Sequence, residues 1–229
     1  MILKQPLIIP PLEGGDRLSR DEFGLRYQAA PHIKKAELIE GVVYVASPVR
    51  ARSHGEPHGL LITWLGVYKA ITPGVGLGDN ATVRLDANNE PQPDGLLRIE
   101  VGGQSRITED DYIEGAPELV AEVAASSASY DLHDKKEAYR RNGVQEYLVW
   151  QVFEQKLDWY RLQDREYVLL EPDEAGIVCS QVFPGLWLAV SALIEGDMVK
   201  VLAVLQDGLN SPKHTHFVQN LSEQNLTLS

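Results

Sequence analysis

The sequence predicts an α/β (α+β) domain built on a mixed sheet, with its core elements in the order helix, three strands, helix, strand. Three observations predict this class. Apolar residues recur at helical spacing over 53–70, and an almost continuous apolar run fills 117–124. A second helical pattern over 130–142 separates that run from a strand-like segment at 144–152. A crossover of this length predicts that Val120 and Leu148 lie on parallel neighbouring strands.

The first half of the chain supplies the early elements. Residues 36–46 predict two short strands hinged at Glu40-Gly41. Ser53 and Glu56 fit a capping box for the following helix, and Thr72-Pro-Gly ends it. Further strands are expected before the central run, over the ranges 75–77, 81–85 and 93–101.

The second half predicts a crossover helix, a hairpin and a late helix. Ser126 to Ser129 are expected to break the central strand and cap the crossover helix, which Gly143 ends. Segments 156–161 and 166–170 alternate like paired strands, and Pro184-Gly185 turns into a strand at 186–190. Asp197 and Gly208 bound the last helix. We therefore expect an N-terminal arm over 1–19, one domain over 20–208 and a flexible tail over 209–229.

Composition narrows the class of protein. The 229 residues are 44% hydrophobic and 24% charged, as in an ordinary globular chain. No apolar run approaches the ~20 residues needed to span a bilayer, and the N-terminus lacks a signal-peptide pattern. The single cysteine, Cys179, predicts a small buried side chain and fits a reducing cytoplasm. The net charge of −12 argues against a general nucleic-acid coat, so such a role needs a local basic patch or a bound cation.

Two acidic residues in this framework point to chemistry. Glu122 lies inside the apolar run, where an unpaired carboxylate costs several kcal/mol and must be protonated, paired or metal-bound. Asp94 follows Pro93 at the start of the preceding strand, although Pro-Asp-Gly is also a common turn. An acid at each of these places can converge on one hard cation, as phosphodiester hydrolysis requires.

The crossover helix concentrates positive charge. It carries Lys135, Lys136, Arg140 and Arg141, and Lys135 shares a face with Tyr139 one turn later. Such cations usually form a solvated face. Beside two carboxylates, however, a lysine polarises an attacking water and stabilises charge on phosphate. This helix also supplies the local positive patch that a nucleic-acid role requires in a chain of net negative charge.

These residues carry a resemblance to a known family. Their motifs are Glu37-Leu-Ile-Glu-Gly41, His54, Pro93-Asp94, Pro117-Glu-Leu-Val-Ala-Glu122-Val, Asp131-x3-Lys135-x3-Tyr139 and Gly143-Val-Gln-Glu-Tyr147-Leu-Val. Together, over about residues 20–190, they resemble the bacterial Uma-two family, candidate restriction endonucleases of largely unknown role. The resemblance implies the PD-(D/E)xK nuclease core of restriction endonucleases, with extra C-terminal strands and a helix.

The resemblance also implies roles for individual residues. Asp94 and Glu122 would be Mg²⁺ or Mn²⁺ ligands, with Glu37 a weaker third. Ala124 stands where the signature has lysine, and Lys135 matches the family's relocated lysine; Lys136 is the alternative. His54 and Tyr139 are expected in the cleft, and the spacing of His54 and His58 does not make a zinc motif. Lys135, Lys136, Arg140 and Arg141 are expected to contact nucleic acid.

The expected function follows from these roles. It is metal-dependent cleavage of phosphodiester bonds in nucleic acid, with DNA the expected substrate. The alternative is a non-catalytic module of the same fold that binds nucleic acid or a protein partner. The sequence does not fix the oligomeric state and leaves a homodimer open.

Overall fold

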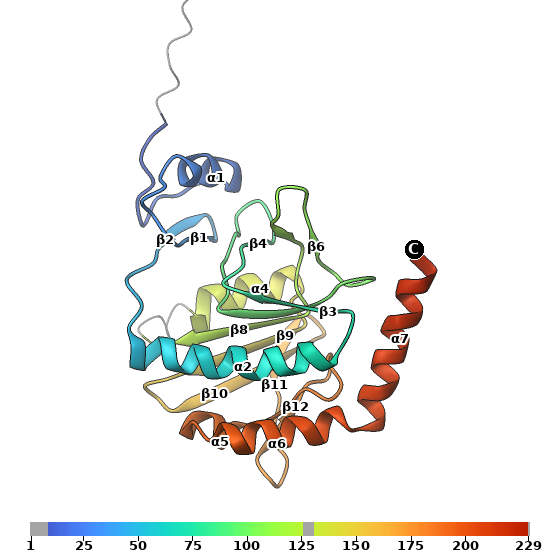
Figure 1. Cartoon of the computed structure of the whole chain (residues 1–229). Coiled ribbons are helices and arrows are strands. Elements are labelled where there is room, and N and C mark those ends of the chain that lie inside the picture. Colours follow the sequence, from blue (N-terminus) through green and yellow to red (C-terminus); the bar gives the residue numbers. More distant parts are fainter. Residues whose placement is uncertain (1–8, 126–130, 229) are drawn as a thin grey trace, which may run out of the picture.

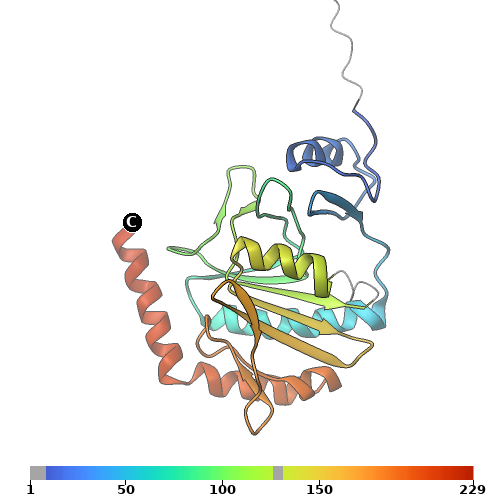
Figure 2. The ribbon, with the colours of Figure 1, turned by 180° about the vertical axis from the view of Figure 1, so that it is seen from behind.

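The computed structural model describes residues 9–125 and 131–228, and these residues form three layers (Figures 1 and 2). A six-stranded sheet lies in the middle. Helices α2, α5 and α6 cover one face and α4 covers the other. The expected capping residues Ser126–Ser129 lie outside the described residues, as does most of the first half of the expected N-terminal arm.

The central sheet is mixed. Its strand order is β11-β10-β9-β8-β5-β3. The strands are β3 (Val75–Asp79), β5 (Gly95–Ile99), β8 (Leu119–Ala124), β9 (Glu146–Gln151), β10 (Lys156–Gln163) and β11 (Glu166–Leu169). β8 and β9 are parallel, with Val120 opposite Tyr147, whereas β3, β5 and β8 pair antiparallel. The predicted parallel crossover is confirmed, because the helical connection returns the chain to the same end of the sheet.

Helices connect and flank these strands. They are α1 (Arg20–Gln28), α2 (Glu56–Ile71), α4 (Lys136–Asn142), α5 (Val190–Glu195), α6 (Met198–Leu209) and α7 (Pro212–Leu228). A wider helical turn precedes two of them: η1 (Ala51–Gly55) before α2 and η2 (Asp131–Lys135) before α4. Gly143 ends α4 with φ +86°, a conformation that side chains other than glycine disfavour, as the sequence predicted.

Three smaller sheets complete the fold. They are β1 (Ala36–Ile39) with β2 (Val42–Val45), β12 (Ile177–Cys179) with β13 (Trp187–Ala189), and β4 (Val83–Arg84) with β7 (Ile113–Glu114) and β6 (Arg106–Ile107). The β1–β2 hairpin turns at Glu40-Gly41, as predicted. The expected strand at 81–85 shrinks to β4 and lies outside the central sheet, so β3, β5 and β8 are the three strands before the crossover.

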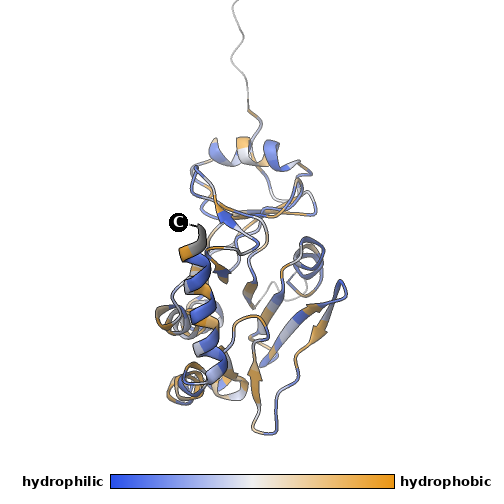
Figure 3. Cartoon of the chain, turned by 90° about the vertical axis from the view of Figure 1, so that its right-hand side faces the viewer, coloured by the Kyte–Doolittle hydropathy of each residue, from blue (hydrophilic) through white to orange (hydrophobic). Residues whose placement is uncertain are grey.

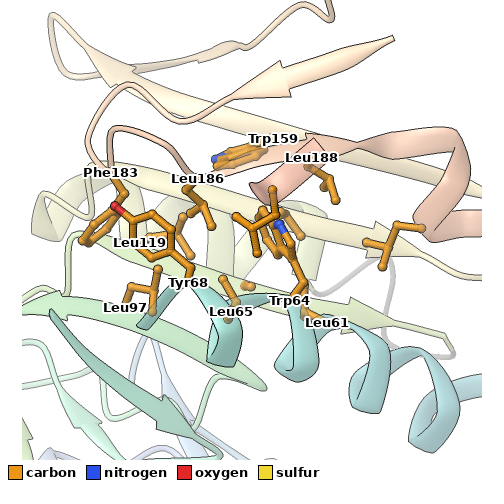
Figure 4. Packing of buried hydrophobic residues seen from close by; sticks show 14 of the residues in the cluster. Leu61, Trp64, Leu65, Tyr68, Leu97, Leu119, Trp159, Phe183, Leu186 and Leu188 are labelled. Atoms are coloured by element: carbon orange, nitrogen blue, oxygen red, sulfur yellow. The ribbon is translucent and has the colours of Figure 1, made fainter. Parts of the chain in front are cut away.

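Alternation along β8 separates two hydrophobic cores. Leu119, Ala121 and Val123 pack toward α2, while Val120 and Ala124 pack toward α4 with Tyr139. Figure 4 shows the larger core, where Trp64 and Tyr68 of α2 lie between the sheet and the loop around Phe183. Each such buried side chain contributes roughly 1.5–3 kcal/mol, so both faces of β8 are fixed. By the same alternation Glu122 points toward α4.

Two predicted details at helix starts and chain ends are wrong. Ser53 lies inside η1 and does not cap α2, because the helical backbone already begins at Ala51. Residues 209–229 were expected to be a loose tail, yet α7 occupies Pro212–Leu228 with Leu221 and His214 buried. Figure 3 shows that this helix is largely hydrophilic, which is why the sequence did not indicate it. It packs against the larger core through Leu221 and Phe217.

The described part of the N-terminal arm packs against the protein. Leu12 and Leu18 are buried with Phe23 of α1 and with the β1–β2 hairpin. Arg17 forms an isolated bridge to Val42. These contacts hold the β1–β2 hairpin against the N-terminal arm and α1. Within the described residues, none of the helices is long and apolar enough to cross a membrane.

Candidate active site: a carboxylate cavity around Lys135

Glu122 is the centre of the site and comes from β8. Its side chain is 2% exposed and points toward η2 and α4. Burial, together with the charges of Asp94, Asp131 and Glu37, raises the pKa of Glu122 to about 8, despite the opposing effect of Lys135. The sequence-based expectation that this carboxylate must be paired is met by two hydrogen bonds.

Lys135 is the partner that binds the carboxylates together. Its ammonium lies 3.0 Å from Glu122 Oε1, 2.9 Å from Glu37 Oε1 and 3.6 Å from Asp131 Oδ1. Burial alone would lower the pKa of Lys135, but the carboxylates raise it well above its usual value. Lys135 is therefore charged at neutral pH and acts as a hydrogen-bond donor.

Tyr139 donates the second hydrogen bond to Glu122. One turn after Lys135, its hydroxyl donates to Glu122 Oε1 at 2.8 Å. Burial and the charge of Glu122 hold the pKa of Tyr139 well above its usual range, so the phenol keeps its proton. The helix thus presents two donors to one carboxylate oxygen, which sets the orientation of that carboxylate.

Asp94 reaches the same place from β5. Gly95 pairs with Ala121, so the antiparallel register sets Asp94 opposite Glu122. Asp94 Oδ2 accepts a hydrogen bond from the Val123 amide at 2.8 Å, which anchors the carboxylate to β8. Its Oδ1 lies 3.6 Å from Lys35 Nζ and 3.5 Å from His54 Nε2. The two acids predicted from sequence therefore converge.

Two histidines border Asp94. His54 comes from η1, and its Nδ1 is buried without a hydrogen-bond partner among the described residues. Burial lowers the pKa of His54, so its ring is neutral near pH 7. His58 Nε2 lies 3.0 Å from Asp79 Oδ1 and 3.1 Å from the Asp94 carbonyl oxygen. His54 is thus part of the site, as the resemblance implied.

Apart from Tyr139, which is not among the lining residues, these side chains line one cavity of about 760 Å³. The end of β2 with the segment after it (44–50), η1 with the start of α2, and the carboxyl end of β8 form its walls. Its ionisable members are Lys35, Glu37, Asp94, Glu122, Asp131, Lys135, Arg50, His54 and His58. Val49 and Phe153 border it with 66% and 62% of their surface exposed. The cavity is therefore large enough for a nucleotide-sized group and is rich in carboxylates.

The other basic residues of the helix do not join this cavity. Lys136 Nζ lies 3.4 Å from the centre of the Tyr160 ring. Arg140 forms ion pairs with Glu137 and Glu166, and Arg141 pairs with Glu40. The four cations predicted to form one nucleic-acid face therefore point to different partners. Only Lys135 among them reaches the carboxylates.

Two residues of the site were given no role from the sequence, although Asp131 stands in the motif Asp131-x3-Lys135-x3-Tyr139. Asp131 lies one helical turn before Lys135, and this i, i+4 spacing was its signal. Lys35 lies two residues before Glu37, and strand alternation was its signal. Both spacings are common in surface segments, so neither residue could be assigned to the site until the fold placed it at the cavity.

Comparisons with known proteins place the chain in a family. No curated protein matches it. The crystal structure of "a putative nuclease belonging to DUF820" from Anabaena variabilis ATCC 29413 superposes with a TM-score of 0.57 at 16% sequence identity, covering 78% of this chain and 98% of that one. That likeness concerns the fold and supports the predicted restriction-endonuclease-like core. Residues 20–191 match the Uma2 family, described as "Putative restriction endonuclease". This chain belongs to the Uma2 family.

Proposed function

We propose that the protein is a metal-dependent endonuclease that hydrolyses phosphodiester bonds in nucleic acid, with DNA as its substrate. One observation carries the proposal. Asp94 and Glu122 lie opposite each other on neighbouring strands, and Lys135 contacts Glu122 within the same cavity. Family membership and the fold of the neighbouring nuclease structure support it.

The donor set fits a hard divalent cation. Carboxylate oxygens are the ligands that Mg²⁺ and Mn²⁺ prefer, and the cluster carries more negative charge than Lys135 balances. Asp94 and Glu122 would hold the cation, with Glu37 as a weaker third ligand. In the described residues no three acidic, histidine or cysteine side chains are grouped so as to hold a metal ion, and the Lys135 ammonium contacts both Glu37 and Glu122. When bound, the cation supplies a water of lowered pKa and charge neutralisation on phosphate.

Lys135 has a defined task in this proposal. Because its pKa is raised, the ammonium keeps its proton and does not act as a base. It instead donates hydrogen bonds that orient water and stabilise negative charge on phosphate oxygens. Lys136, on the ring of Tyr160, has no contact with Glu122 and is the weaker alternative. Tyr139 serves as a positioning residue for Glu122.

A non-catalytic role remains the second candidate because of charge. Arg140 and Arg141 are already ion-paired, and Lys135 is enclosed by carboxylates. A module with this surface would bind a partner without cleaving it. Binding of nucleic acid without product would favour this candidate.

The test is a cleavage assay with labelled duplex DNA, single-stranded DNA and RNA in Mg²⁺ or Mn²⁺. We expect cleavage of DNA that EDTA abolishes. Glu122→Gln should lose it, while Asp158→Asn, a buried aspartate of β10 outside the cavity, should keep it. Wild-type protein that leaves every substrate intact across both metals would contradict the proposal.

A second comparison assigns the lysine. Lys135→Ala should lower the cleavage rate by ~10²–10³-fold, and Lys136→Ala by less than about threefold. Removing Lys135 also leaves buried carboxylates unpaired, at a cost of about 3–5 kcal/mol, so folding is checked by thermal melting. If Lys136→Ala is the inactive variant, the role of Lys135 is wrong.

A further inference from the structure

The strand that carries Glu37 also presents a lysine to the cavity. Side chains alternate along β1 and the residue before it, so Lys35 and Glu37 share one face. Both line the cavity, whereas Ala36 is buried in the N-terminal core. Lys34 points elsewhere, and its ammonium donates to the Pro31 carbonyl oxygen at 3.4 Å. Neighbouring lysines therefore have different surroundings.

Lys35 contacts Asp94 without being enclosed. Its ammonium donates to Asn80 Oδ1 at 2.9 Å and lies 3.6 Å from Asp94 Oδ1. The Lys35 side chain is 25% exposed. The backbone holds its position, because the Ala46 amide donates to the Lys35 carbonyl oxygen at 2.9 Å across the hairpin. The backbone of Lys35 is therefore fixed, while a quarter of its side chain is exposed to solvent.

Lys135 is in the opposite situation. Its side chain is 4% exposed, and three carboxylates lie within 3.6 Å of its ammonium. To bind a phosphate, it must give up contacts that are costly to break in a buried site. Lys35 has one carboxylate neighbour and one neutral amide. A phosphate that approaches Asp94 therefore meets Lys35 at a lower cost.

We infer that Lys35 contacts the phosphate of the bound nucleic-acid strand beside Asp94 when the strand binds, and that Lys135 acts afterwards, at the reacting phosphate beside Glu122. This inference rests on the proposed function and names the residue that recognises the substrate at that site. A phosphate contact from Lys35 also explains how so acidic a protein could bind a polyanion. A chain of net charge −12 that presents several carboxylates needs an accessible cation at the place where the polyanion enters.

The test is the salt dependence of binding. Fluorescence anisotropy measures the Kd of a labelled oligonucleotide in Ca²⁺, at increasing salt, for full-length wild type, Lys35→Ala, Lys35→Arg and the control Lys34→Ala. Loss of one phosphate contact should weaken binding by about tenfold. It should also make the slope of log affinity against log salt shallower by ~0.7–0.9. Lys35→Arg and Lys34→Ala should keep the wild-type slope.

A merely structural Lys35 gives a different result. Its removal would change the affinity of Asp94 for Mn²⁺ but leave the salt slope at the wild-type value, and that outcome overturns the inference. Lys35→Gln, which keeps polar reach toward Asn80, repeats the test if Lys35→Ala folds poorly. If wild type cleaves DNA and both variants bind with wild-type slope, this inference alone fails. If wild type neither binds nor cleaves, the proposed function fails with it.

Discussion

Glu122 shows how one residue in an apolar run determines a site. The run makes β8 a central strand, and alternation turns Glu122 toward α4. Because a buried carboxylate without hydrogen bonds is costly, Glu122 is stable there only with donors, and Lys135 and Tyr139 are those donors. Burial, together with the surplus of nearby negative charge, leaves the pKa of Glu122 at about 8. The same surplus is what a divalent cation would neutralise.

The raised pKa of Glu122 predicts a pH dependence of stability. Between its ordinary value of 4.5 and about 8, the folded protein holds a proton that the unfolded chain has lost. The free energy of unfolding of the metal-free wild type therefore falls as pH rises through this window. Glu122→Gln lacks this contribution, so the variant should gain on the wild type by on the order of 3 kcal/mol, or roughly 6–12 °C in Tm, from pH 5 to 8.

Thermal or urea unfolding of both proteins in EDTA measures this difference. Burial also raises the pKa of Glu146, which both proteins share, so only the difference between the two curves reports on Glu122. A difference that is constant from pH 5 to 8 would show that Glu122 keeps an ordinary pKa.

Tyr139 provides a matched pair with Tyr167. Tyr139→Phe removes the hydrogen bond to Glu122, and Tyr167→Phe removes one to the Val144 carbonyl oxygen at 2.9 Å. Each should cost about 1 kcal/mol of stability. Only Tyr139→Phe should weaken Mn²⁺ binding, by about tenfold, because it releases the carboxylate. Calorimetric titration that finds equal Mn²⁺ affinity in the two variants would remove Tyr139 from the site.

At the scale of elements, strong local signals were the predictable ones. The apolar run of β8, the Glu40-Gly41 hinge and the Asp197 cap of α6 each define structure within a few residues. α1 was missed although Ser19 and Glu22 have capping-box spacing and the Glu22 amide donates to Ser19 Oγ. α7 was missed because its five apolar residues are scattered among polar ones, and its stability comes from tertiary packing.

The packing of α7 predicts a contrast between two of its leucines. Leu221 is 4% exposed and lies against Gly74, where a Cβ would come within 3.2 Å of the Leu221 Cβ, whereas Leu226 is 80% exposed. Leu221→Ala should lower the free energy of unfolding by about 2–4 kcal/mol. Leu226→Ala should change it by less than about 0.5 kcal/mol. Urea unfolding decides, and equal effects would mean that α7 does not dock as described.

The candidate site was predictable where residue chemistry alone was sufficient. Asp94, Glu122 and Lys135 stand out because acids and a lysine beside an apolar strand need partners. The roles of Arg140 and Arg141 were not predictable, because their partners Glu166 and Glu40 lie 26 and 101 residues away in sequence. Lys35 was hidden for the same reason, since its contact with Asp94 exists only after the hairpin packs.

At the scale of the whole molecule, an acidic chain concentrates its chemistry in one cavity. The net charge of −12 leaves few cations for a polyanion, and most of the crossover-helix cations are ion-paired. The family match ends at residue 191, so α6 and α7 lie beyond it and stabilise the α2 face away from the carboxylates. In the proposed function, a bound metal, Lys35 and Lys135 would together determine whether the protein acts on nucleic acid.

The most direct test of this account is the Mn²⁺ dependence of the single-turnover cleavage rate of labelled DNA. The wild-type rate should rise and saturate with Mn²⁺, and Asp158→Asn should follow the same curve. Asp94→Asn should need at least about tenfold more Mn²⁺ to reach half of its own maximal rate, because it loses a ligand charge. An Asp94→Asn curve that superposes on the wild type, or a wild-type rate that does not depend on the metal, would contradict the central claim.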